Sequence, residues 1–259
     1  MLNHRKVNLI FPLLFILLLT LDLRIGISNW FYPALVVLKL AVMFWGSYFI
    51  NSNYHIKTLC EIKTDEKIIA LTFDDGPDNT VTPALLQVLK KHNVKAAFFC
   101  IGRKIEGKEN VIKQIDSEGH IIGNHSFSHS NFFDFFIARK MKNEFEHSDK
   151  LVFDATGKQM NFFRPPYGIT TPAMKKAVAE KQYHTIGWSV RSMDSMQKNE
   201  EKLMSKLTAQ LKPGAVFLFH DTWQGVVPLI DKFLNEVKAQ GFKVVRPDEL
   251  FKVNACKNV

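Results

Sequence analysis

The chain has 259 residues, of which 46% are apolar, and a formal net charge of +9. This length suits one catalytic domain with an appendage, and the apolar content excludes global disorder. The lysines are scattered rather than gathered in a basic stripe with interleaved aromatics, which argues against a nucleic-acid partner and favours a surface near anionic lipid. Three widely spaced cysteines, Cys60, Cys100 and Cys256, provide neither a disulfide framework nor a cysteine-based zinc site.

The first fifty residues differ from the rest of the chain. Residues 7–21 carry no charge, and residues 25–50 are interrupted only by Lys39, which has to snorkel or lie near an interface. The second stretch is long enough to cross a bilayer, which needs about 20 residues. No convincing cleavage site follows the first stretch. We therefore predict a membrane anchor over residues 1–54, with two spans or one span and an interfacial segment. A buried soluble hairpin is the alternative.

From residue 67 onward, apolar runs alternate with helical patterns. The predicted strands are 68–73, 95–101, 120–123, 161–164, 184–190, 215–219 and 242–245. The predicted helices are 82–92, 109–118, 135–153, 172–181, 200–211 and 227–240. This alternation predicts an α/β fold with about seven parallel strands over residues 55–259. Polar residues follow several strands, as at the mouth of a (β/α) barrel, and the length favours a small or distorted barrel. A doubly wound open sheet is the alternative.

Two adjacent carboxylates end the first predicted strand. Asp74 and Asp75 follow the apolar run, and neighbouring residues that leave a strand point in different directions. One carboxylate can therefore bind a metal ion while the other takes a proton. Gly76 and Pro77 then turn the chain. Because Asp, Gly and Pro are also common in solvated turns, this motif alone fits either interpretation.

Three histidines follow other strands. His125 and His129 are four residues apart, so both can face one metal ion from a helical turn or a tight loop. Imidazole together with carboxylate suits zinc or a similar divalent ion. His220 follows the run 215–219, and its ordinary pKa near neutrality suits a general acid. Such histidines also occur as incidental or core residues, so only their combination is specific.

A proline pair ends the strand predicted over residues 161–164. Arg164 can orient a carboxylate, and Pro165 and Pro166 fix the backbone. A backbone N–H in this loop, which continues to Tyr167, can face an oxyanion. The alternative is a simple turn that ends the strand.

In this order, these groups resemble the NodB-homology polysaccharide deacetylases, also called carbohydrate esterase family 4. The resemblance covers residues 68–245. The intact motifs are TFDDGP at 72–77, HSFSH at 125–129, RPPY at 164–167 and LFH at 218–220. Four intact motifs in the family's order make the match highly specific.

The resemblance implies a role for each matching residue. It implies a divalent metal ion, with Zn²⁺ as the first choice, held by Asp75, His125 and His129. The other implied roles are a general base at Asp74 positioned by Arg164, a general acid at His220, an oxyanion-binding backbone N–H at Tyr167, and an acetyl pocket lined by Leu218 and Trp188. The chain is thus expected to hold the family's complete machinery.

The fourth family motif, D-x-x-D-W, is not intact. Arg191 replaces its first acid and Ser195 replaces its tryptophan, while Asp194 is kept and can pair with His220. The change affects the shape of the substrate site more than its basic chemistry. The missing aromatic predicts a wider groove. Arg191 either faces an anionic group, such as a phosphate or carboxylate, or points to solvent.

The resemblance implies a hydrolase that removes N-acetyl groups from amino sugars of an envelope polysaccharide, peptidoglycan or a lipid-linked precursor. An O-acetyl esterase and a non-catalytic membrane-bound glycan-binding protein are the alternatives, and the complete set of catalytic residues argues against the latter. The family mostly acts outside the cytoplasm, so we expect the catalytic domain on the exported face of the cell membrane. The lysines that flank the apolar stretches favour the cytoplasmic face if both stretches cross.

Overall fold

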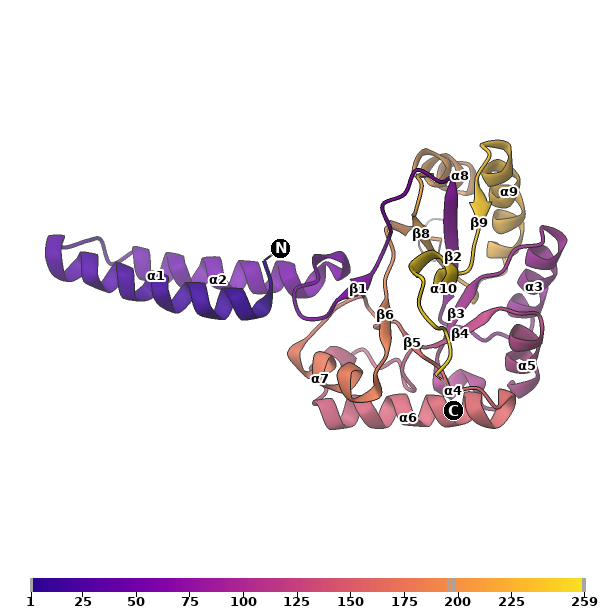
Figure 1. Ribbon diagram of the computed structural model, residues 1–259, viewed down its shortest axis with the longest axis horizontal. Coiled ribbons are helices and arrows are strands. Elements are labelled where there is room, and N and C mark those ends of the chain that lie inside the picture. Colours follow the sequence, from indigo (N-terminus) through magenta and orange to yellow (C-terminus); the bar gives the residue numbers. More distant parts are fainter. Residues whose placement is uncertain (1, 195, 197–198, 258–259) are drawn as a thin grey trace.

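The structure is a computed structural model that describes residues 2–194, 196 and 199–257. It consists of a helical hairpin that projects from an α/β barrel (Figure 1). Ser195, at the tryptophan position of the fourth motif, lies outside the described residues.

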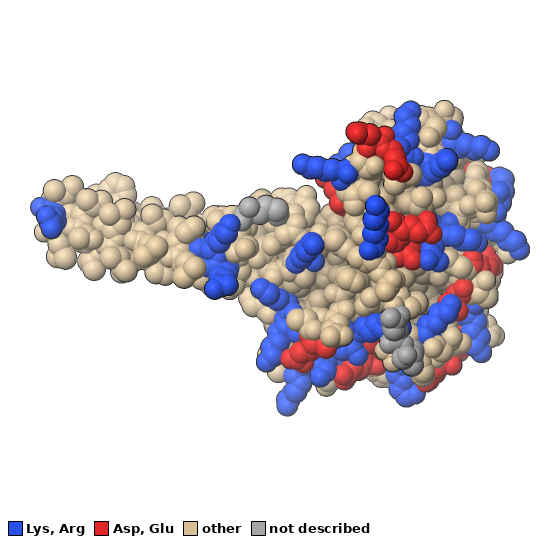
Figure 2. Space-filling model, viewed as in Figure 1, with Lys and Arg blue, Asp and Glu red and all other residues tan. Residues whose placement is uncertain are grey.

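The two apolar stretches at the N-terminus form the projecting hairpin. Its helices are α1 (His4–Ile25) and α2 (Phe31–Tyr48), followed by the 3₁₀ helix η1 (Ile50–Ser52). Asp22 and Arg24, between the two apolar stretches, belong to the end of α1, where the Asp22 carboxylate accepts hydrogen bonds from Ile27 N–H and the Tyr32 hydroxyl. Both helices are long and apolar enough to cross a membrane, and only 6% of the apolar window of each is buried (Figure 2). The hairpin is therefore not buried against the rest of the described chain.

The barrel is built from parallel strands. In the described part of the chain these are β1 (Thr58–Leu59), β2 (Ile68–Asp74), β3 (Ala97–Cys100), β4 (Ile121–Asn124), β5 (Phe162–Phe163), β6 (His184–Ile186), β7 (Val190–Arg191), β8 (Val216–His220) and β9 (Lys243–Val244). Their order is β1-β6-β5-β4-β3-β2-β8-β7, and β9 pairs with β2. Crossover helices join the successive strands from β2 to β6 and from β7 to β9, which allows parallel pairing.

The strand order shows that the sheet curls into a distorted barrel. β6 pairs with β5, whereas β7 pairs with β8 at the other end of the order. Only residues 187–189 separate β6 from β7, and such a connection spans at most about 14 Å. The two ends of the sheet must therefore lie close together, which confirms the predicted distorted barrel and excludes an open sheet.

The single strand predicted over residues 184–190 is thus two strands. Gly187 N–H donates to the Leu59 carbonyl, 2.8 Å away, and Ser189 N–H donates to the Val216 carbonyl, 3.1 Å away. The backbone therefore changes partners within three residues. The two-residue strand β1 is too short to show a period and was not predicted.

Helices cover the outside of the barrel (Figure 1). The helices after the hairpin are α3 (Val81–Lys91), α4 (Gly102–Ile105), α5 (Glu109–Ser117), the 3₁₀ helix η2 (Phe133–Phe135), α6 (Ala138–Thr156), α7 (Pro172–Lys181), α8 (Glu200–Ala209), α9 (Val226–Ala239) and α10 (Pro247–Phe251). Leu250 of α10 instead packs against Ala70 and Val216, on the inner face of the strands. The helix predicted from residue 135 begins at Ala138, because the preceding residues form η2.

Strand alternation separates two hydrophobic layers. On β3, Phe98 packs in the large cluster beneath the helices, whereas Ala97 and Phe99 belong to a smaller cluster with Ile121 and Phe162. The Phe73 and Phe98 rings stack at 5.1 Å in the large cluster. On β2 the same alternation gives Thr72 and Asp74 the face opposite to Phe73. The first carboxylate of the Asp-Asp pair is thereby directed away from the layer beneath the helices.

Candidate active site

The polar residues of the motifs meet at one rim of the barrel. Asp74 ends β2, His125 follows β4, Arg164 follows β5 and His220 ends β8. Parallel strands bring their carboxyl ends to the same edge, which is why residues far apart in the chain converge. They border a cavity of about 500 Å³. Its lining residues are Tyr48, Asp74, Asp75, His125, Asn131, Asp134, Phe135, Pro166, Tyr167, Ile169, Trp188, Arg191, Leu218 and His220.

Three side chains at this rim can hold a metal ion. Asp75 Oδ1 lies 3.5 Å from His125 Nε2 and 3.3 Å from His129 Nε2. One ligand atom from each of these residues lies within 4.8 Å of the others. His125 Nδ1 is 2.8 Å from the Arg164 carbonyl, which leaves Nε2 free to coordinate. His129 Nε2 is buried without a hydrogen-bond partner among the described residues. This donor set fits a catalytic site for a divalent metal ion, with positions left open for water and substrate.

The electrostatics of these residues suit coordination. Burial and the positive charge of His125 lower the pKa of His129 to about 4, so its imidazole is neutral at physiological pH. Burial alone raises the pKa of Asp75, but the hydrogen bond from His125 and the charges of His125 and His129 hold it below its usual range. A neutral imidazole and an ionised carboxylate are the forms that bind a divalent cation.

The loop that carries the two histidines is held from both sides. The Asn124 side chain accepts a hydrogen bond from Ser126 N–H at 2.9 Å. The Glu144 carboxylate on α6 accepts from Phe127 N–H at 3.1 Å and from Ser128 N–H at 2.6 Å. Ser126 has a positive φ of 61°, and these bonds stabilise that left-handed conformation. The H-x-x-x-H motif is thus a tight loop and not a helical turn.

Arg164 is fully buried and positions Asp74. Its Nη1 donates to Asp74 Oδ1 at 2.7 Å and to the Thr72 hydroxyl at 2.8 Å. Its Nε and Nη2 donate to the carbonyls of Ile186 and Gly187 at 3.0 and 2.7 Å. All the bonds of this guanidinium are therefore directed at fixed acceptors, which compensates for burying a charge. The second carboxylate oxygen, Asp74 Oδ2, lies 3.8 Å from His125 Nε2.

His220 is paired with the retained acid of the fourth motif. Its Nδ1 lies 2.7 Å from Asp194 Oδ1, and its backbone N–H donates to Asp194 Oδ2 at 2.8 Å. The Ser192 hydroxyl also donates to Asp194 Oδ1, at 2.8 Å. Burial alone lowers the pKa of His220, but the hydrogen bond to Asp194 and the Asp194 charge raise it above its usual value. With Nδ1 occupied, Nε2 is the nitrogen that can exchange a proton.

Comparison with known proteins identifies the family. The polysaccharide deacetylase family model matches residues 61–186. A peptidoglycan-N-acetylglucosamine deacetylase of Bacillus cereus is 34% identical over 194 residues, which cover 72% of this chain and 69% of that relative. The chain belongs to the polysaccharide deacetylase family.

Two further comparisons agree with this assignment. The peptidoglycan-N-acetylmuramic acid deacetylase PdaA of Bacillus subtilis is 36% identical, and the match covers 72% of each chain. The solved structure of the Bc1960 peptidoglycan N-acetylglucosamine deacetylase matches with a TM-score of 0.72 at 32% identity, covering 76% of this chain and 94% of that chain. The barrel described above is therefore the fold of the polysaccharide deacetylases.

The residues that the family resemblance assigns to substrate binding lie in the cavity. Trp188, Leu218 and Tyr167 line it, and Gly168, with a φ of +71°, lies so close to Trp188 that a Cβ there would be 2.5 Å from the indole. The Tyr167 backbone N–H has no hydrogen-bond acceptor among the described residues, so it can serve a ligand. All predicted site residues thus line the cavity or lie directly behind its walls.

Arg191, which departs from the polysaccharide deacetylase pattern, also lines the cavity. Its guanidinium lies 6.0 Å from the Trp188 ring. Within the described residues it has no ion-pair partner, whereas many surface cations of this protein do. An unpaired arginine at a site wall suits a phosphate or carboxylate.

The sequence motifs did not identify several cavity residues. Tyr48 comes from the end of α2, and Asn131, Asp134 and Phe135 come from the loop after His129. Burial raises the pKa of Asp134 to about 6. The aromatic-rich run at 132–136 follows the HSFSH motif directly, and this pattern could have indicated that the loop belongs to the site. No local pattern linked Tyr48 to the site.

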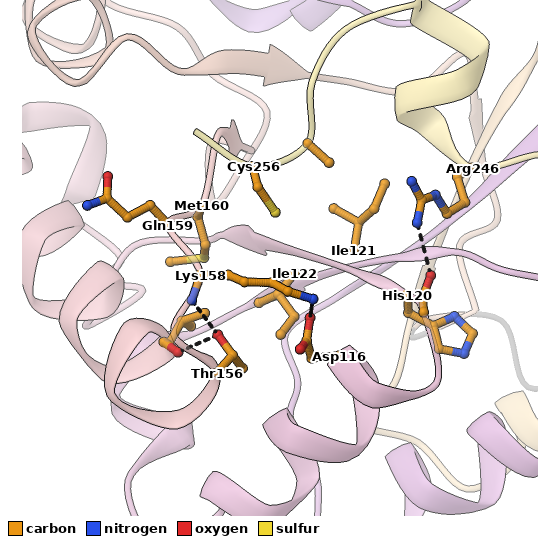
Figure 3. A pocket seen from close by; sticks show the side chains of 13 residues that line it. Asp116, His120, Ile121, Ile122, Thr156, Lys158, Gln159, Met160, Arg246 and Cys256 are labelled. Carbon is orange, nitrogen blue, oxygen red and sulfur yellow. Dashed lines mark hydrogen bonds and ion pairs between the residues drawn. The ribbon is translucent and has the colours of Figure 1, made fainter. Parts of the chain in front are cut away.

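A second, smaller cavity lies at the start of β4, whereas the catalytic residues follow the ends of the strands (Figure 3). It has a volume of about 100 Å³. Lys158 on its wall is paired with Asp116 at 2.6 Å, and Arg246 is paired with Asp248 at 2.5 Å. Because its charges are neutralised within the protein, this cavity does not compete with the barrel mouth as a catalytic site.

Proposed function

We propose that this polysaccharide deacetylase is a metal-dependent hydrolase that removes N-acetyl groups from amino sugars of a cell-envelope glycan. The observation that carries this proposal is the Asp75–His125–His129 triad, two members of which, Asp75 and His125, line the same cavity as Asp74 and His220. The peptidoglycan deacetylases among its relatives support the substrate class. One carboxylate and two imidazoles favour Zn²⁺.

In the proposed hydrolysis, Asp74, the Tyr167 backbone N–H and His220 each have one role. When bound at the triad, a divalent ion supplies Lewis-acid polarisation of the acetyl carbonyl and lowers the pKa of water. Asp74 takes a proton from the attacking water through Oδ2, because Arg164 holds Oδ1. The carbonyl becomes an oxyanion as the new C–O bond forms, and the Tyr167 backbone N–H stabilises it. His220 then protonates the sugar nitrogen as the C–N bond breaks, leaving acetate and a free amine.

Acetate release on a substrate panel tests the proposed function. The panel contains chitooligosaccharides, peptidoglycan fragments and acetylxylan, each assayed with chelator and with metal add-back. We expect acetate from an N-acetylated glycan, loss of activity with chelator and recovery with Zn²⁺. Preference for acetylxylan would favour an O-acetyl esterase, and inactivity on every substrate would favour a glycan-binding protein.

The pairing of His220 with Asp194 predicts the pH dependence. A general acid acts only while protonated, so turnover falls as pH rises through the raised pKa of His220. Asp194→Asn removes the charge that raises this pKa, so the alkaline limb of the kcat profile should move to lower pH. Measuring kcat from pH 5 to 9 checks this. An unchanged alkaline limb in the variant would remove the pair from the mechanism.

The Arg191 guanidinium lines the cavity and has no ion-pair partner among the residues that the structure describes, which predicts selection of anionic substrates. Arg191→Ala should lower kcat/KM about tenfold on phosphorylated amino sugars, the size of one charge-assisted hydrogen bond, and leave neutral oligosaccharides unaffected. Lys206→Ala is the matched control, because Lys206 is a neighbouring cation that does not line the cavity and whose Nζ donates to the Arg191 carbonyl at 3.3 Å. Equal losses on neutral and phosphorylated substrates would contradict this role.

We also propose that the hairpin, residues 1–54, anchors the catalytic domain to the cell membrane on its exported face. Two spans would put the N-terminus and the domain on one side, since His4 N–H donates to the Tyr54 carbonyl at 3.0 Å. The relatives are named as peptidoglycan deacetylases, which favours the exported side for the catalytic domain. Arg5 and Lys6, before the first apolar stretch, favour the cytoplasmic side for the N-terminus.

The native cysteines allow a direct test of this orientation. Cys256 is exposed, whereas Cys60 and Cys100 are buried. A membrane-impermeant maleimide should therefore label Cys256 in intact cells, and Cys256→Ser should abolish the signal. Labelling that requires lysis would place the domain in the cytoplasm.

A further inference from the structure

The end of the apolar hairpin forms part of the catalytic cavity. Tyr48 is the last residue of α2 and lines the same cavity as Asp74 and His220. Its ring packs against Phe44 at 5.6 Å and against Phe49 at 5.2 Å, so an aromatic group continues from the helix to the mouth of the site. A substrate in the cavity therefore lies next to the surface of α2.

The hairpin is joined to the barrel rigidly and over a short distance. Residues 49–57 alone separate α2 from β1. Within them Tyr54 is 2% exposed and lies so close to Gly46 that a Cβ there would be 2.3 Å from its ring. The Ser47 carbonyl accepts a hydrogen bond from Thr170 N–H, in the loop beside the cavity, at 3.0 Å. The cavity therefore cannot move far from whatever surface the hairpin enters.

A second aromatic residue of the cavity is also exposed, and its neighbours are exposed and apolar. Phe135 lines the cavity and is 84% exposed, and its neighbours Phe132 and Ile137 are 70% and 63% exposed. Soluble proteins rarely expose such groups together, whereas aromatic residues are enriched where proteins meet the lipid headgroups. We call Phe132, Phe135 and Ile137 the loop rim.

We infer that the active site works at the lipid surface, on an N-acetylated amino sugar that is still joined to a membrane lipid through a phosphate. The hairpin end and the loop rim contact the lipid, and Arg191, which has no ion-pair partner in the described part of the chain, binds the phosphate in the same cavity. A glycan polymer distant from the membrane lies beyond the reach of the nine-residue connection. This inference rests on the proposed N-deacetylase function.

The first test compares two substrates with the full-length protein in phospholipid vesicles. One is a soluble chitooligosaccharide, and the other is N-acetylglucosamine on a polyprenyl diphosphate in the same vesicles. The double variant Phe132→Ser, Ile137→Ser changes rim residues that do not line the cavity. It should lose about tenfold in acetate release from the lipid-linked sugar and keep its rate on the soluble one. Equal effects on both substrates, or no effect on either, would overturn the inference.

Phe153→Ser is the matched control, because Phe153 is exposed on α6 and outside the catalytic cavity. It should leave both rates unchanged. A loss on the lipid-linked sugar as large as that of the rim variant would also overturn the inference, since any exposed phenylalanine would then suffice.

The second test does not depend on catalysis. Phe132→Cys in a Cys256→Ser background carries a fluorophore, while the buried Cys60 and Cys100 stay unlabelled. Lipids brominated near the headgroup should quench this fluorophore in vesicles, and should not quench one at Phe153→Cys. Absence of quenching at position 132 would overturn the inference. Quenching without acetate release from either substrate would place the rim at the lipid and contradict the proposed function instead.

Discussion

Replacing His125 with alanine is expected to abolish tight binding of a divalent metal ion and, with it, turnover. The substitution leaves Asp75 and His129 as the only ligands of the triad, and two ligands rarely hold zinc. The substitution also leaves the Arg164 carbonyl without its hydrogen bond to the His125 imidazole. Elemental analysis of the purified variant, together with acetate release, measures both effects.

His147→Ala is the matched control for this prediction. His147 is exposed on α6, and its ring stacks on that of Phe127, in the loop that carries His125, with 3.9 Å between the ring centroids. It should keep one metal ion per chain and its activity. Undiminished metal in His125→Ala would contradict the ligand assignment. A thermal unfolding profile similar to that of the wild type in the presence of chelator shows that the fold itself persists.

Asp74→Asn is expected to keep the metal ion but lose about 10²–10⁴-fold in kcat, the usual contribution of a general base. The amide oxygen can still accept the hydrogen bond from Arg164, so the side chain should stay in place. Only the capacity to take a proton disappears. Steady-state kinetics and metal analysis on one preparation separate the two effects.

Asp154→Asn controls for the loss of one carboxylate charge. Asp154 is exposed on α6 and pairs with Lys150. Surface ion pairs contribute little to stability, about 0–1 kcal/mol, so this variant should have normal stability and a normal rate. A near-normal rate in Asp74→Asn would remove Asp74 from the proton transfer, and loss of metal would make it a ligand instead.

The sequence by itself determined the repeating plan of the barrel and the placement of its motif residues. Apolar runs that stop at Asp74 or His220 mark strand ends, and parallel strands bring such ends to one rim. Periodicity and length alone therefore predict that the motif residues converge. Composition also separated the apolar hairpin from the rest of the chain, because both of its helices are long and apolar enough to cross a membrane.

Only the tertiary structure decided how Tyr48 of the hairpin and Phe135 of the loop rim complete the cavity. Tyr48 and Phe135 are far apart in the chain, and their meeting at one cavity depends on how the hairpin end packs against the barrel. Likewise, the break between β6 and β7 arises because Gly187 and Ser189 bond to different strands, not from any local preference. The hydrophobic periodicity of a segment encodes which face of a helix or strand is apolar. Which helices and strands pack together is set by contacts between residues far apart in the chain.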